Sequence, residues 1–91
     1  MSKTIILAGE ESISAGIANS STVSNATVVR VFNDSGSDLT ITVTDPAGNN
    51  SYSGVGSISM PDNHIEFIEK HPSYTIYGSG GFKATKVGFT G

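Results

Sequence analysis

The chain lacks cysteine and tryptophan, and only 14% of its 91 residues are charged. The absence of cysteine excludes disulfide cross-links and every metal centre that is built on thiolates. A domain of this length buries roughly 60–70% of the surface that its unfolded chain exposes, so its core is thin. Small domains without cross-links often gain stability by assembling with copies of themselves or with a partner. We therefore expect an interaction role.

The charged residues are too few and too scattered for nucleic-acid binding. The net charge is −3, and the five basic residues form no stripe that would follow a phosphate backbone: Lys3, Arg30, Lys70, Lys83 and Lys86. A polar surface with few charges suits a dense symmetric assembly, because repulsion between like charges stays small.

No apolar run is long enough for a secretory signal or a membrane span. The first such run, Ile5–Ala8, is shorter than a signal-peptide core, and a membrane helix needs about 20 apolar residues. We therefore expect no membrane partner. Because the chain begins with Met, we expect a complete product that is made in a cytoplasm.

Short apolar runs separated by turn residues predict an all-β fold. Ala26–Asn33 is rich in β-branched residues with apolar side chains on both faces, which indicates a central strand. A turn cluster around Gly36 follows, and Leu39, Ile41 and Val43 then alternate with threonines, as in a half-buried strand.

Similar runs recur about every 8–12 residues, which is the spacing of strands in a sandwich or jelly roll. The sequence thus predicts a single small antiparallel β-sandwich over residues 1–91, jelly-roll or immunoglobulin-like, with about seven to eight short strands. Residues 1–25 are a candidate extended N-terminal arm. In the last strand the apolar positions shift from even to odd numbers near Lys86, which predicts a bulge or a change of face.

Two pairs of polar residues are the candidate metal ligands. His64 and Glu66, and likewise Glu69 and His71, lie two positions apart and thus share a strand face. Their spacing is not a recognised zinc signature, and Lys70 between them would repel a cation. A solvated strand face is the favoured interpretation, and we expect no metal and no cofactor.

Other chemical signatures are equally weak. Asp45–Asn50 is rich in oxygen ligands, but it lacks the spacing and the closing Glu of an EF-hand and is typical of a turn. The sequence has no nucleophile elbow, P-loop or dinucleotide fingerprint. We therefore expect that the protein is not an enzyme.

Three tyrosines keep a second function open. Tyr52, Tyr74 and Tyr77 would suit an aromatic platform for a sugar, with the Asp45–Asn50 loop beside it. Tyrosine is also common at sheet rims and protein interfaces, where the ring packs and the hydroxyl finds a partner. The alternative prediction is a carbohydrate-binding or adhesion module.

The last third of the chain carries a series of short segments. They read PDN at 61–63, FIEK at 67–70, PSYTI at 72–76 and KATKVGFT at 83–90. This series resembles the C-terminal half of small structural proteins in the virions of tailed bacteriophages, notably phages of marine and freshwater bacteria.

The resemblance implies a non-enzymatic virion component that is present in many copies. It favours a head-decoration (cement) protein that binds the major capsid protein, or another virion protein, as a homo-oligomer such as a trimer. In that role we expect the arm to be anchored by Ile5, Leu7 and Ile13, and contacts to be made by Tyr74 and Tyr77. The alternative becomes an adhesion module of a virion fibre or tail.

Overall fold

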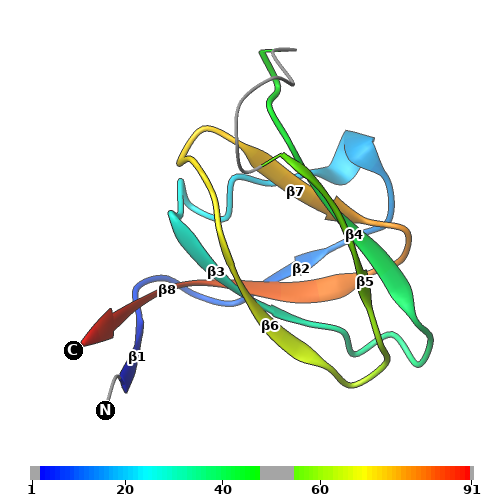
Figure 1. The fold of residues 1–91 in the computed structure, drawn as a ribbon, viewed down its shortest axis with the longest axis horizontal. Coiled ribbons are helices and arrows are strands. Elements are labelled where there is room, and N and C mark those ends of the chain that lie inside the picture. The colour runs from blue at the N-terminus through cyan, green and yellow to red at the C-terminus, as the bar shows by residue number, and fades with distance from the viewer. Residues whose placement is uncertain (1–2, 48–54, 91) are drawn as a thin grey trace.

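The computed structural model describes residues 3–47 and 55–90, which form an antiparallel β-sandwich (Figure 1). This architecture confirms the predicted all-β fold and the predicted number of strands. The elements are β1 (Lys3–Ile6), β2 (Glu11–Ile13), the 3-10 helix η1 (Ile17–Asn19), β3 (Val28–Phe32), β4 (Leu39–Thr44), β5 (Gly56–Met60), β6 (Ile65–Glu69), β7 (Thr75–Gly78) and β8 (Phe82–Thr90).

The strands form two sheets with the nested pairing of a jelly roll. The larger sheet has the order β1-β8-β3-β6, with β2 on the other half of β8, and the smaller sheet has the order β5-β4-β7. A bridge from Ser21 to Ile76 adds a further segment beside β7. Reading inward along the chain, β2 pairs with β8, the Ser21 segment with β7, β3 with β6 and β4 with β5. Of the two predicted forms of sandwich, this order is that of the jelly roll.

The core lies between the sheets because alternate residues of each strand point inward. Val29 and Val31 are buried from the larger sheet, and Ile41 and Val43 are buried from the smaller one. Other buried side chains complete this cluster, among them Met60, Ile76 and Phe82.

The glycine-rich turn between β7 and β8 packs directly on this core. A Cβ atom at Gly78 would lie 3.0 Å from the Phe82 ring, and one at Gly80 would lie 2.7 Å from Leu39 Cδ2. At Gly78 a Cβ atom would also lie 2.9 Å from the Gly80 carbonyl oxygen, so this position has no room for a side chain, whereas at Gly80 the Leu39 side chain would have to shift.

The N-terminal segment expected as an extended arm is part of the sandwich. Lys3–Ile6 pairs with the end of β8, and Glu11–Ile13 pairs with its beginning. Further along, Val23, Ser24 and Asn25 have φ angles of 54°, 56° and 57°, so the chain makes a left-handed turn before it enters β3. Val23 is fully buried, and its burial offsets the cost of placing a β-branched residue in this conformation.

Asn33 ties the turns at one end of the sandwich together. Its side chain is fully buried, and its Nδ2 donates to the carbonyl oxygens of Ser37 (2.8 Å) and Met60 (2.9 Å). Its Oδ1 accepts bonds from the backbone N–H (3.0 Å) and the hydroxyl (2.7 Å) of Ser35. In addition, the Asn33 N–H donates to the His64 carbonyl, so this residue links the β3–β4 turn to the end of β5 and the start of β6.

Replacing Asn33 with Asp tests this network. The carboxylate keeps the size and the acceptor but removes both Nδ2–H donors and sets a negative oxygen against two carbonyls. We expect the free energy of unfolding at pH 7, measured by urea titration, to fall by about 3 kcal/mol and to recover partly in acid. Asn19→Asp is the control, because the Asn19 amide bonds to Ala15 at an exposed position. Equal losses in the two variants would contradict the proposed network.

Candidate interaction surface

The end of β8 carries its apolar residues on the outer face of the larger sheet, which is the face turned away from the smaller sheet. Pairing is one-to-one from Lys83 to Lys86 against β3, and again from Val87 to Thr90 against β1. These pairs contain no bulge, so Phe82 and Ala84 point inward, and Val87 and Phe89 point outward. The apolar side chains of β8 thus change from the inner to the outer face, as predicted, while the strand itself stays regular.

We call β1 together with residues 87–90 of β8 the terminal ribbon. It forms the corner of the sandwich where both chain ends lie (Figure 1). All four residues of β1 are exposed. The exposed fraction is 73% for Ile6, 54% for Leu7 and 49% for Phe89. Apolar side chains are thus exposed along the ribbon and at Leu7, which follows β1, whereas Val87 is buried at the start of this half of β8.

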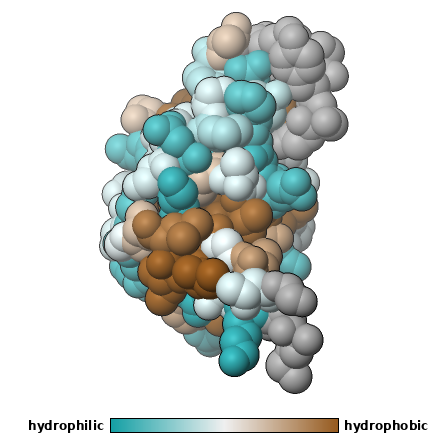
Figure 2. Space-filling view, turned by 90° about the vertical axis from the view of Figure 1, so that its left-hand side faces the viewer, coloured by the Kyte–Doolittle hydropathy of each residue, from teal (hydrophilic) through white to brown (hydrophobic). Residues whose placement is uncertain are grey.

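The outer patch comprises Ile6, Ile65, Phe67 and Phe89, all exposed on the larger sheet. The rings of Phe67 and Phe89 contact each other edge to face, with centroids 5.4 Å apart. Figure 2, which views the molecule from the side where the ribbon lies, shows apolar residues gathered into one continuous area. Contiguous apolar areas of this kind mark interaction sites in soluble proteins.

An open groove of about 440 Å³ adjoins the outer patch, lined by Ile6, Glu10, Arg30, Phe67 and neighbouring residues. The Arg30 guanidinium lies 3.7 Å from the Glu10 carboxylate and also 5.9 Å from the centre of the Phe32 ring. The groove therefore combines an apolar wall with one ion pair.

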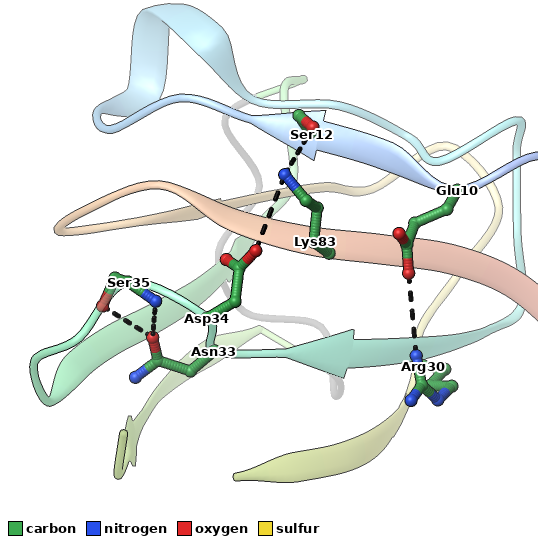
Figure 3. Close-up of polar contacts among 7 residues, drawn as sticks. All are labelled: Glu10, Ser12, Arg30, Asn33, Asp34, Ser35 and Lys83. Carbon is green, nitrogen blue, oxygen red and sulfur yellow. Dashed lines mark hydrogen bonds and ion pairs between the residues drawn. The ribbon is translucent and has the colours of Figure 1, made fainter. Parts of the chain in front are cut away.

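The polar half of the outer face consists of paired charges (Figure 3). Lys83 Nζ lies 3.6 Å from the Asp34 carboxylate and 2.8 Å from the Ser12 hydroxyl, which joins β8 to β2 and to the turn after β3. Exposed pairs of this kind contribute only about 0–1 kcal/mol each. A partner would therefore gain more binding free energy by covering the apolar half of this face than by covering the polar half.

The residues expected to make contacts do not share one surface. Ile5 is 40% exposed and lies on the terminal ribbon, and Leu7 directly follows β1. Ile13 and Tyr74 are buried in the core, and Tyr77 is half-buried on β7 in the other sheet. The structure thus brings together two of the five expected residues.

The candidate metal ligands remain dispersed. His64 Nε2 lies 3.6 Å from a Glu66 carboxylate oxygen, whereas His71 Nδ1 is hydrogen-bonded to the Ser73 hydroxyl. Within residues 3–47 and 55–90, no three His, Cys, Asp or Glu residues gather closely enough to hold a metal ion.

The other candidate sites are only partly covered by the structure. Asp45 Oδ1 accepts a bond from the Ala47 N–H, as in the predicted turn. The rest of the expected calcium loop and Tyr52 lie outside the described residues.

The outer patch was not assigned from the sequence. Periodicity groups Ile65 with Phe67 and Val87 with Phe89, but it does not say which face of a strand is covered. The sequence did contain one signal, because the apolar positions of β8 change from even to odd numbers. Even and odd positions of a regular strand lie on opposite faces, so the two sets cannot both face the core.

Comparison of the chain with protein-family models, with curated proteins and with solved structures finds no match. No helix in the part of the chain that the structure describes is long and apolar enough to cross a membrane. The function is therefore argued from the surface geometry of the described residues.

Lys70 is a buried base between the candidate metal ligands, and its side chain points inward. The residue is 4% exposed, and its Nζ donates to the Ala26 carbonyl at 2.8 Å and to the His71 carbonyl at 3.4 Å. Burial lowers the pKa of the Lys70 ammonium from 10.5 to about 8. Between these two pH values the unfolded chain holds a proton that the folded chain has lost, so stability rises with pH.

Lys70→Met should abolish this rise. We expect the difference in free energy of unfolding, variant minus wild type, to fall by up to about 3 kcal/mol between pH 7 and pH 10.5. Wild type becomes more stable over this range because deprotonation removes the desolvation cost of its buried ammonium. Urea unfolding at several pH values measures the difference. Lys3→Met removes an exposed lysine and is the control. The same pH-dependent difference in both variants would rule out Lys70 as its source.

Proposed function

We propose that the chain is a non-enzymatic structural protein of a tailed-phage virion and decorates the head. In this proposal the outer patch docks on the capsid lattice, with the major capsid protein or another virion protein as the partner. The observation that carries the proposal is the continuous apolar area around Phe67 and Phe89 on the outer face of the larger sheet.

The composition of the outer face supports docking on a protein. Aromatic residues at the centre with polar groups around them are the usual arrangement of protein interfaces, where a few buried aromatic anchors carry most of the affinity. Phe67 and Phe89 are each about half exposed, so covering them removes further apolar area from water. This gain is about 25 cal/mol for each Å² covered.

The fold and the likeness to virion proteins give further support. Jelly rolls occur in viral capsid proteins and in lectins, so the architecture is compatible with a virion role by analogy. The segments FIEK, PSYTI and KATKVGFT, which resemble those of small virion proteins, form parts of β6, β7 and β8. Two of these strands carry the outer patch. The lectin analogy leaves the carbohydrate-binding module as the alternative.

Co-sedimentation with phage heads that lack this protein tests the proposal. The heads are prepared from the virus that carries this sequence. We expect wild type to bind saturably and the double variant Phe67→Ser/Phe89→Ser to bind at least about 10-fold more weakly, because both anchors are lost. Ile58→Ser is the matched control, since Ile58 is 44% exposed on β5 of the other sheet.

Binding of the double variant at wild-type affinity would contradict docking through the outer patch. Absence of binding by wild type would contradict the decoration role. In the latter case a glycan array, run with and without calcium, tests the carbohydrate-binding alternative. Urea unfolding of each variant confirms that it is folded under the binding conditions.

A further inference from the structure

β1 is an edge strand, and within residues 3–47 and 55–90 the backbone hydrogen-bonding groups on its outer side have no partner. The Leu7 N–H donates to the Lys86 carbonyl at 2.9 Å, so Leu7 and Lys86 form a hydrogen-bonded pair at the end of the β1–β8 ladder. Hydrogen-bonded and non-bonded pairs alternate along an antiparallel ladder, so Ile5 also faces β8 with its N–H and C=O. The N–H and C=O groups of Thr4 and Ile6 therefore point to the open edge.

This edge lacks the protection that sheet edges usually carry. Charged residues, prolines and bulges normally prevent an edge strand from pairing with another chain. At the opposite edge of the same sheet, β6 carries Glu66 and Glu69. In β1 the only charge is on Lys3, at its start, and Thr4–Ile6 is an uncharged β-branched run with side chains on both faces.

We propose that β1 pairs with β1 of a second copy of this chain, antiparallel and about a two-fold axis at Ile5. Side chains that lie opposite each other in such a pair share one face of the combined sheet. An odd-numbered residue therefore lies opposite an odd-numbered residue of the second copy. Centring on Ile5 places Thr4 opposite Ile6 of the second copy and uses the straight segment from residue 3 to residue 7. Centring on Ile6 would include Ala8, where the chain bends.

The strand is complementary to itself in this register, which is why a second copy fits it. Thr4 and Ile6 each offer one donor and one acceptor, and the two-fold axis pairs every one of them with its counterpart, giving four backbone bonds. Ile5 meets Ile5 at the axis, and Lys3 lies beside Leu7 of the second copy, so the two lysines are at opposite ends. This pairing does not depend on binding to a capsid.

A symmetric disulfide tests the register. Opposed residues of a non-hydrogen-bonded pair have Cα atoms about 4.5 Å apart, within the range that a disulfide spans. The chain has no cysteine, so Ile5→Cys introduces a single thiol. We expect mild oxidation to convert Ile5→Cys to a covalent dimer of twice 9.4 kDa on a non-reducing gel. Thr4→Cys is the control and should stay monomeric there, because Thr4 faces Ile6 and not itself.

Charge complementation gives an independent readout. By light scattering after size exclusion, we expect a dimeric mass for wild type and for the control Ile58→Glu on β5. Ile5→Glu and Ile5→Lys should each be monomeric, since like charges meet at the axis, and their mixture should return to the dimeric mass. A monomeric or trimeric wild type, equal cross-linking of Ile5→Cys and Thr4→Cys, or a mixture that stays monomeric would overturn the proposal.

Discussion

The buried amide of Asn33 is the interaction on which the arrangement of this sandwich depends. A thin core of apolar side chains favours two packed sheets but does not determine how their connecting turns meet. Asn33 supplies this information, because its polar atoms bond both to the adjacent turn, at Ser35 and Ser37, and to groups far along the chain, including Met60 and His64. A buried polar network of this kind is costly when incomplete, so it selects one arrangement of the turns. With those turns fixed, β3 and β6 are held in register, and β8 lies next to β3.

β8 connects the core to the surface. Its first half contributes Phe82 and Ala84 to the interior, and its second half presents Phe89 on the outer face. One strand thus serves both stability and recognition, because the smaller sheet covers only part of the larger one. The side chains that stabilise the fold lie from Phe82 to Val87 and the exposed apolar ring of Phe89 follows them, so Phe89 can change with little effect on the core.

The sequence was sufficient for the fold class, because alternation in segments such as Leu39–Thr44 depends only on local geometry. It was insufficient for the assignment of Ile13 and Tyr74, since a strand pattern does not show which segment another sheet covers. The left-handed turn at Val23 has no local signal either, because burial of a β-branched residue outweighs its backbone preference. The outer patch combines residues from β1, β6 and β8, and only the tertiary structure brings these strands together.

The two ends of the described chain also lie together, since Lys3 is opposite Thr90 in the terminal ribbon. A purification tag or a fluorescent protein attached at either end would therefore emerge at the same corner, next to the open edge of β1. Such a fusion is not a neutral handle for this molecule: it occupies the space beside the ribbon whichever end carries it.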